Sequence, residues 1–346
     1  MQIPQRVELT LLRAVMALPE SAQRVLGGGS LVLDGQTLAP ETRLTLRLKE
    51  LTRMPGVEEL PMAQARALVD RQAALTGGTQ PIGAVRDLPV AGLPGRLYTP
   101  TDPAPDPLPL LVFFHGGGFM YGGLDSHDAP CRLLAERAGV RVLAVDYRLA
   151  PEHRFPAAHD DAVAAYRWVV ANAASLGADP SRLAVGGDSA GAKLSIAVAA
   201  AAAAEGLPLA FQLLVYPGTD FTRATRSHDL FAEGLYLTRE FIELANSSYV
   251  PDPADALDPR MSPLLHDVPP GLAPAYVATA GFDPLRDEGE AYARKLADAG
   301  VSVQLRRFSD QIHSFFNICG VGRRSPAAVA EIALRLKAGL ARPGER

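Results

Sequence analysis

The spacing of apolar residues changes along the chain and divides it into regions. From residue 1 to about residue 80 they recur three and four positions apart, as at Val7, Leu11 and Leu18, and this spacing predicts amphipathic helices. The segment 44–51 also has helical spacing, although Leu46 makes it alternate as in a strand, and we predict a helix there. These helices are expected either to pack on a core or to form part of a lid.

Short apolar runs and helical segments alternate after residue 80. The runs 84–90 and 95–99, separated by Gly92 and Pro94, predict an antiparallel pair of strands at a sheet edge. Further strands are expected at 108–114, 140–147, 182–185 and 210–216, with helices between them at 130–138, 157–174 and 190–205. Strands that alternate with helices predict an α/β fold with a mostly parallel, doubly wound sheet and right-handed crossovers.

The alternation stops between residues 218 and 263, where turn-forming residues surround a helical piece at 238–248. An interruption of this length is typical of a lid. The alternation resumes with strands at 275–281 and 301–308 and helices at 287–299 and 327–340. We therefore predict an N-terminal helical cap segment (1–80), a core (81–217 and 264–346) and a cap insertion (218–263).

Composition narrows the class of partner. The 346 residues are 48% hydrophobic and 21% charged, as in an ordinary globular protein, and the net charge is −4 with no block of Lys or Arg. This argues against nucleic acid or an anionic membrane and favours a small neutral substrate. Arg13 interrupts the apolar run 9–18, so we expect no secretory signal, and the run 194–204 is too short to cross a bilayer. A cytoplasmic protein without stable membrane insertion, with Cys131 and Cys319 as unpaired core thiols, is the prediction.

The candidate chemistry centres on Gly187-Asp188-Ser189-Ala190-Gly191, which fits the G-x-S-x-G nucleophile elbow. An apolar run precedes it and an alanine-rich, helix-prone run follows, so the serine is expected on a sharp turn between a strand and a helix. The two glycines are explained if strand and helix approach too closely for a Cβ. A phosphate loop is excluded because Lys193 does not directly follow a glycine, as the Walker A pattern requires.

A nucleophilic Ser189 needs a base and an acid that orients the base. In this fold the order is serine, acid, histidine, and His313 lies shortly after the predicted strand 301–308. Asp283 follows the strand before it, at the carboxyl end where sites in open α/β sheets gather. Asp287 and Asp310 compete for the acidic role, but Asp287 is expected to start a helix and Asp310 to shape a turn near His313.

A second glycine-rich stretch is expected to bind the oxyanion. Gly116, Gly117 and Gly118 directly follow the apolar run 110–114, and loops of this type supply backbone N–H groups together with the residue after the nucleophile, here Ala190. His115 is interpreted as a residue that shapes this loop. Candidate pocket residues for the acyl or alcohol part of a substrate are Phe119, Tyr121, Tyr216, Leu235 and Phe315.

On these motifs the chain resembles the bacterial hormone-sensitive-lipase-like carboxylesterases over roughly residues 84–320. The motifs are His115-Gly-Gly-Gly-Phe, Asp146-Tyr-Arg-Leu-Ala-Pro-Glu-His with Phe155-Pro-Ala-Ala, Gly187-Asp-Ser-Ala-Gly and Asp283-Pro-Leu-Arg-Asp-Glu. The resemblance implies a cap made from N-terminal helices and an insertion, short- to medium-chain acyl ester substrates, no cofactor or metal, and frequent homodimers. It also implies structural roles for Tyr147, Arg148, Glu152, Asp160 and Asp161.

Two residues depart from the family pattern. Ser314 follows the candidate base where the family usually has glycine, and His159 stands where the family often has an apolar residue. The predicted function is a serine carboxylesterase that works through an acyl-enzyme. The alternatives are an amidase or aryl-formamidase, an esterase for an acylated sugar or antibiotic, and a non-catalytic protein that binds a small ligand in the same pocket.

Overall fold

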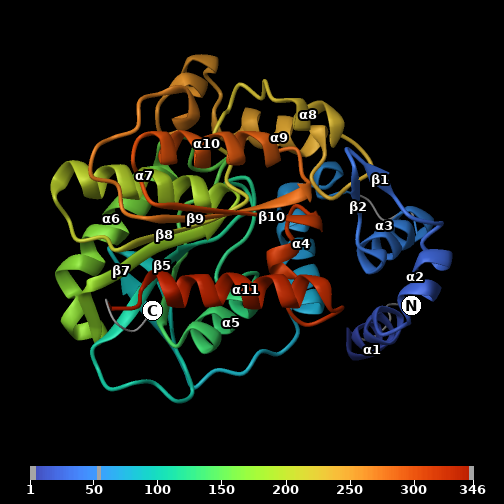
Figure 1. Ribbon diagram of the computed structural model, residues 1–346, viewed down its shortest axis with the longest axis horizontal. Helices are drawn as coiled ribbons and strands as arrows, with labels where there is room; N and C mark the ends of the chain where they lie inside the picture. The colour runs from blue at the N-terminus through green and yellow to red at the C-terminus, as the bar shows by residue number, and fades with distance from the viewer. Residues whose placement is uncertain (1–4, 53–55, 343–346) are drawn as a thin grey trace.

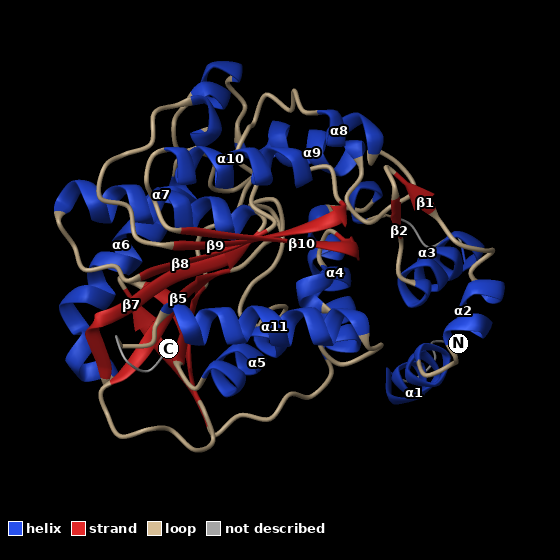
Figure 2. Cartoon of the chain, viewed as in Figure 1, coloured by secondary structure: helices blue, strands red, loops and turns tan. Residues whose placement is uncertain are grey.

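The computed structural model describes residues 5–52 and 56–342. Residues 1–4 and 53–55 of the predicted cap segment and residues 343–346 of the predicted core lie outside the described residues. The chain forms a mostly parallel eight-stranded sheet with helices on both faces (Figures 1 and 2), so the predicted fold class is confirmed.

The sheet has the strand order β10-β9-β8-β7-β5-β6-β4-β3. Neighbouring strands run parallel except where β4 pairs with β3 and with β6, so the predicted antiparallel edge pair is present. The strands are β3 (Ala84–Val90), β4 (Leu93–Thr99), β5 (Leu108–Phe114), β6 (Arg141–Val145), β7 (Ala178–Asp188), β8 (Phe211–Val215), β9 (Ala275–Phe282) and β10 (Val303–Ile312).

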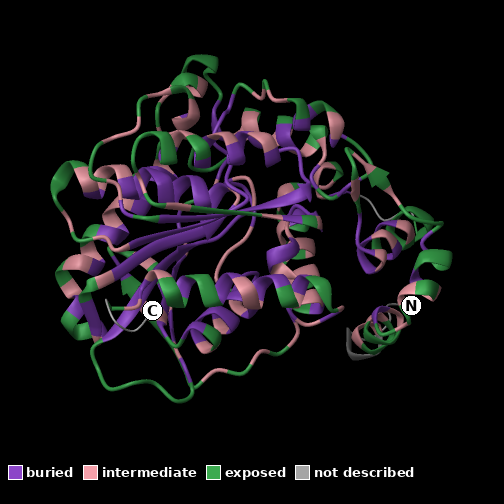
Figure 3. Ribbon diagram, viewed as in Figure 1, coloured by how far each residue is buried: buried purple, intermediate pink, exposed green. Residues whose placement is uncertain are grey.

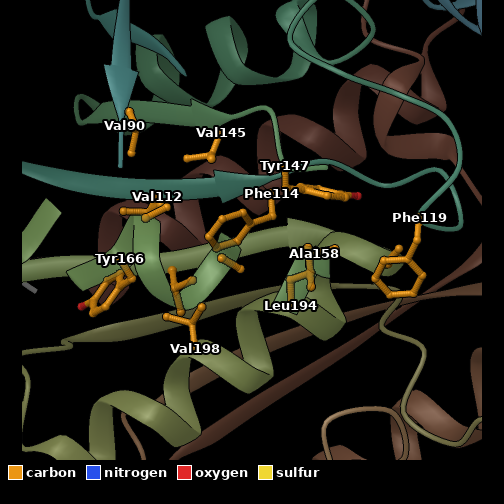
Figure 4. Close-up of a cluster of buried hydrophobic side chains, with 14 of the residues drawn as sticks. Val90, Val112, Phe114, Phe119, Val145, Tyr147, Ala158, Tyr166, Leu194 and Val198 are labelled. Carbon is orange, nitrogen blue, oxygen red and sulfur yellow. The ribbon is translucent and has the colours of Figure 1, made fainter. Parts of the chain in front are cut away.

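Two layers of helices bury the sheet. Helices α5 (Asp128–Ala138) and α11 (Arg324–Gly339) pack on one face, and α6 (Ala157–Asn172), α7 (Ala190–Glu205) and α10 (Arg286–Asp298) pack on the other. Every residue of β5 is buried, as expected for a central parallel strand that packs on both faces. Figure 4 shows Leu194 and Val198 of α7 against Val112 and Phe114 of β5, and Figure 3 shows the sheet as the most buried part of the molecule.

The N-terminal region is mainly helical, as predicted. It contains α1 (Gln5–Met16), α2 (Glu20–Leu26), α3 (Pro40–Thr52) and α4 (Met62–Gly77), so the ambiguous stretch 44–51 is a helix. A short hairpin, β1 (Val32–Leu33) and β2 (Gln36–Thr37), was not predicted. In Figure 1 the strand arrows of the central sheet point towards the side of the molecule where α3 and α4 lie.

The segment 218–263 contains α8 (Arg226–Leu230), α9 (Arg239–Tyr249) and the 3₁₀ turn η3 (Pro253–Leu257), with η4 (Pro263–Leu265) at its end. The sequence prediction ends the last strand too early: β10 ends at Ile312, with a register shift against β9 between Phe308 and Ile312. His313 therefore follows the strand directly instead of lying several residues along a loop. The irregular register interrupts the apolar pattern that marked the strand.

Two further findings concern the whole described chain. Cys131 and Cys319 are buried free thiols, as predicted. In the ranges 5–52 and 56–342, no helix combines the length and the apolar character needed to cross a membrane.

Candidate active site

Ser189 occupies the sharp turn between β7 and α7. Its backbone has φ +54° and ψ −116°, a conformation that a residue with a side chain rarely adopts. A Cβ on Gly187 or on Gly191 would lie within 3.0 Å of the Phe114 carbonyl oxygen, and the one on Gly187 would also lie within 3.0 Å of the Gly191 backbone. The glycines therefore allow β7, α7 and the end of β5 to meet.

The structure brings Ser189, His313 and Asp283 together from the carboxyl ends of three strands. The Ser189 hydroxyl donates to His313 Nε2 at 3.0 Å, and His313 Nδ1 donates to Asp283 Oδ2 at 2.8 Å. Asp283 is fully buried, and its other oxygen accepts the Leu285 amide at 2.8 Å. This arrangement fixes the imidazole tautomer and leaves Nε2 free to take the hydroxyl proton.

The two competing carboxylates have other partners. Asp287 lies in the first turn of α10 and accepts the Ser227 amide at 3.0 Å, so its expected place at a helix start is confirmed. Asp310 forms an ion pair with Arg324 at 3.5 Å. Asp283 therefore has the position from which a carboxylate can orient His313.

Asp188, the residue before the serine, lies at the centre of a buried network that sequence reasoning missed. One carboxylate oxygen accepts the Gly116 amide at 2.8 Å and lies 3.1 Å from His127 Nε2, and the other accepts the Tyr216 hydroxyl at 3.1 Å. Burial by itself raises the pKa of Asp188, but His127 and the Gly116 amide hold it below its usual range. The network connects the glycine loop with the turn that carries Ser189.

This network corrects one predicted oxyanion donor. The Gly116 amide is engaged by Asp188, and a Cβ on Gly116 would lie within 3.0 Å of that carboxylate, so Gly116 positions the loop. Within the part of the chain that is described, the amides of Gly117, Gly118 and Ala190 have no hydrogen-bond partner. Gly117 and Gly118 have φ of +119° and +62°, and Ala190 begins α7. These three amides are the donors available to an oxyanion.

His115 supports the loop from below. Its Nδ1 donates to the Gly116 carbonyl at 2.8 Å, and its ring stacks on Tyr147 with centroids 4.2 Å apart. The Tyr147 hydroxyl donates to the His115 carbonyl at 2.7 Å. Burial lowers the pKa of His115 to about 3, so the ring stays neutral at pH 7 and suits the predicted loop-shaping role.

The other residues implied to be structural also have structural partners. Arg148 pairs with Asp161 at 2.7 Å, and Glu152 pairs with Arg66 of α4 at 2.7 Å. Arg66 in turn donates to the Met120 carbonyl just after the glycine loop, at 2.9 Å. These pairs connect the loop with the N-terminal helices and with α6.

His159, the residue that departs from the family pattern, is buried away from Ser189. Its Nδ1 lies 2.8 Å from the Tyr249 hydroxyl of α9, and Phe119 and Phe155 pack around the ring. Burial lowers the pKa of His159 to about 3. The imidazole therefore serves as a neutral packing group between α6 and the insertion.

Two cavities meet at Ser189. The larger is bordered by His313, the glycine loop, N-terminal residues and part of the insertion: Lys49, Val57, Glu58, Val69, Gln72, Gly116, Gly117, Gly118, Tyr121, Gly122, His127, Asp188, Ser189, Tyr236, Leu237, Phe241, His313, Ser314 and Asn317. The smaller is bordered by α7, α9 and the segment after β8: Gly118, Phe119, Ser189, Ala190, Lys193, Gly218, Phe221, Arg223, Leu237, Phe241, Ile242, Ala245, Asn246 and Leu285. We refer to them as the first and second cavities.

Only part of the predicted pocket lies in these walls. Tyr121 lines the first cavity and Phe119 the second. Tyr216, Leu235 and Phe315 line neither, which corrects the prediction. Tyr216 packs its ring 4.4 Å from that of His313 and turns its hydroxyl towards Asp188, and Phe315 is fully buried beside it. Leu235 belongs to a separate apolar cluster with Phe231 and Phe282.

The pocket walls that sequence reasoning missed come mostly from the two segments outside the core. Phe241 and Leu237 of the insertion line both cavities, and Val57 and Val69 of the N-terminal region line the first. Ordinary apolar spacing was their only signal. In the described ranges, no group of three or more His, Cys, Asp or Glu side chains is placed to hold a metal ion.

Comparisons with known proteins agree on one family. A family model described as alpha/beta hydrolase fold matches residues 111–317. The chain is 43% identical over 338 residues to the carboxylic ester hydrolase LipN of Mycobacterium tuberculosis, covering 94% of this chain and 89% of LipN. It is 41% identical over 298 residues to an ethyl acetate hydrolase of Pseudomonas putida, covering 82% and 93% of the two chains. A solved structure of LAE6, an alpha/beta hydrolase enzyme from the metagenome of Lake Arreo, Spain, has a TM-score of 0.84 at 41% identity and covers 87% of this chain and 98% of that chain.

Proposed function

The chain belongs to the hormone-sensitive-lipase-like carboxylesterases of the α/β-hydrolase fold and is a carboxylic ester hydrolase, and we propose that it cleaves short-chain acyl esters with Ser189, His313 and Asp283. The observation that carries this proposal is the hydrogen-bonded chain from Asp283 through His313 to Ser189, with links of 2.8 and 3.0 Å, beside three amides that have no partner among the described residues. An activated nucleophile and a set of oxyanion donors are what acyl transfer requires.

The reaction proceeds in two acyl transfers. His313 Nε2 takes the proton of Ser189 as Oγ attacks the ester carbonyl, and Asp283 stabilises the imidazolium that forms. The amides of Gly117, Gly118 and Ala190 receive the developing oxyanion. His313 then gives its proton to the departing alcohol, which leaves an ester on Ser189. Water, deprotonated by the same base, releases the acid and restores the hydroxyl.

The position of His313 assigns the two cavities. The leaving alcohol must lie within reach of the proton on Nε2, and His313 lines the first cavity but not the second. We therefore assign the alcohol to the first cavity and the acyl chain to the second. The two segments outside the core, residues 1–80 and 218–263, contribute walls to the cavities, and we propose that together they form the cap.

The size of the second cavity favours short acyl chains. The volume of the second cavity is about 40 Å³, and that of the first is about 110 Å³. The second cavity is therefore the smaller of the two and suits the smaller part of a substrate. We therefore expect it to take acyl chains of about two to four carbons.

The test is hydrolysis of p-nitrophenyl esters from acetate to palmitate, with Ser189→Ala as the control. We expect the highest kcat/KM on acetate to butyrate, a steep fall beyond butyrate, and loss of several orders of magnitude in the variant. If wild type and variant are equally inactive on every ester, the proposed catalytic role of Ser189 is wrong. If the optimum lies at long chains, the assignment of the acyl chain to the second cavity is wrong.

A further inference from the structure

The second cavity is bordered by three polar side chains that an alkyl chain does not need. Lys193 comes from α7, one turn after Ser189, Arg223 from the segment after β8, and Asn246 from α9. Three separate elements of the chain therefore place polar residues at the border of the cavity assigned to the acyl chain. The remaining walls, such as Phe119 and Phe221, are mostly apolar.

Lys193 is almost completely buried, with 2% of its surface exposed. Its amino group donates to the Met261 carbonyl and lies 4.6 Å from the centre of the Phe221 ring. A lysine amino group has more than one N–H donor, and among the described residues this is its one hydrogen bond. Burial, followed by the nearby Arg223, lowers the pKa of Lys193. The side chain thus has donor capacity left over next to the cavity.

Arg223 and Asn246 each bring a buried polar atom that has no partner among the described residues. In Arg223 this atom is Nε, a donor, while Nη1 binds Glu288 at 3.2 Å. In Asn246 it is Oδ1, an acceptor. Arg223 is also held at φ +59°, a strained conformation for a side chain of this size. Buried polar atoms are rarely left unpaired, and a donor and an acceptor on one cavity are both satisfied by a hydroxyl group.

The charges around the cavity favour a neutral ligand group. Arg223 carries a positive charge and pairs with the buried carboxylate of Glu288, while the lowered pKa of Lys193 favours its neutral amine. Burial raises the pKa of Glu288, but Arg223 and His228 hold it below its usual value, so this carboxylate stays ionised. The positive charge of Arg223 is therefore already offset by Glu288 at 3.2 Å, and a carboxylate on the substrate would find no net positive charge.

We propose that the second cavity binds a short acyl chain that carries a hydroxyl group, with Lys193, Arg223 and Asn246 as specificity-determining residues. This inference rests on the proposed function, because it takes Ser189 as the nucleophile and the second cavity as the acyl side. The hydroxyl accepts a hydrogen bond from Lys193 or Arg223 and donates one to Asn246. The unsubstituted chain of the same shape leaves Arg223 Nε and Asn246 Oδ1 without a partner among the described residues.

A matched pair of substrates tests this. Ethyl 3-hydroxybutyrate and ethyl 3-methylbutyrate differ by a hydroxyl in place of a methyl group. The ratio of their kcat/KM values is divided by the ratio of their rates of alkaline hydrolysis, which removes the difference in intrinsic reactivity. For one enantiomer of the hydroxy ester, we expect this normalised ratio over the methyl ester to be about ten or more in the wild type. This is the size expected for one hydrogen bond to a charged group.

Two variants remove the proposed contacts, and one control retains them. Lys193→Met and Asn246→Leu should each reduce the normalised ratio by about tenfold. Lys295→Met is the control, because the Lys295 ammonium also donates to a backbone carbonyl, that of Leu264, at 2.8 Å, but lines neither cavity. It should leave the ratio within twofold of the wild type. A purely structural role of Lys193 would slow both esters equally.

A wild-type ratio near one overturns this inference while leaving the proposed function intact, provided that both esters are hydrolysed with dependence on Ser189. This outcome is measured on the wild type alone, so it does not depend on whether a variant folds. A ratio that is unchanged in both Lys193→Met and Asn246→Leu also overturns it. Loss of Ser189-dependent hydrolysis of every ester overturns both the proposed function and this inference.

Discussion

The substitution Asp188→Asn tests whether the buried carboxylate next to the nucleophile positions the oxyanion donors. Asparagine keeps the shape of aspartate and removes its charge. Three donors lie within hydrogen-bond distance of the carboxylate: the Gly116 amide at 2.8 Å, His127 at 3.1 Å and the Tyr216 hydroxyl at 3.1 Å. The change therefore weakens three contacts without opening a cavity.

The magnitude follows from those three contacts. A hydrogen bond to a charged group contributes about 1.5–3 kcal/mol and a neutral one about 0.5–1.5, so each contact loses about 1 kcal/mol and the fold about 3 kcal/mol. If the weaker Gly116 contact reduces the stabilisation of the transition state by the neighbouring amides by the same 1 kcal/mol or so, kcat falls about fivefold. Complete misplacement of one oxyanion donor sets the upper limit, a loss of roughly 10²–10³.

The assay is steady-state hydrolysis of p-nitrophenyl acetate, together with urea unfolding. We expect kcat to fall between fivefold and a hundredfold with KM changed by less than about threefold, since the amides act mainly in the transition state. Asp179→Asn is the matched control: Asp179 is a buried carboxylate at the other end of β7 that binds Ser181 and Arg182. It should lose stability and keep its kcat. A kcat for Asp188→Asn within twofold of the wild type would refute the positioning role.

Three further outcomes are expected. Asp283→Asn should lower kcat on p-nitrophenyl acetate by about 10⁴ because the imidazole loses its orienting acceptor, and equal losses in Asp310→Asn would contradict the assignment of the acid. The pKa of Glu288 in the folded protein lies below its unfolded value of about 4.5, so its contribution to stability is present above that pH and is lost as the pH falls through the lower folded value. The urea concentration at the unfolding midpoint should therefore decrease once the pH falls below about 4.5. Equal midpoints at pH 4 and pH 7 would contradict this. Phe241→Ala should raise the ratio of kcat/KM for p-nitrophenyl octanoate over butyrate about tenfold, because Phe241 lines both cavities. Leu244 lies on the same helix and lines neither cavity, so Leu244→Ala should leave this ratio unchanged.

The glycine positions show why so much of the site could be predicted. A serine between Gly187 and Gly191 after an apolar run predicts a strand, a sharp turn and a helix, because only glycine fits where the backbones meet. The order of Ser189, Asp283 and His313 along the chain then follows from the alternation of strands and helices. These are local patterns, and each element of the core alternation formed within a few residues of its predicted bounds.

The residues that were assigned wrongly or missed depend on contacts between distant segments. Gly116 has the same local signal as Gly117, yet Asp188, 72 residues away, engages its amide. Tyr216 and Phe315 have the size and polarity of pocket residues, yet Tyr216 packs against the His313 ring and Phe315 packs against Tyr216. No spacing rule distinguishes an aromatic residue that lines a cavity from one that supports its floor.

The sequence alone therefore determined the class of fold, the nucleophile turn and the order of the chemical groups, because each is set by backbone conformation and by the period of apolar residues along one segment. Tertiary structure alone decided which amides remain free among the described residues, which side chains line the cavities and which polar residues border the second one. Those properties arise where Lys193, Arg223 and Asn246 meet from three elements that are far apart in the chain. A contact between separate elements does not change the period of apolar residues in either element, so the sequence pattern does not predict it.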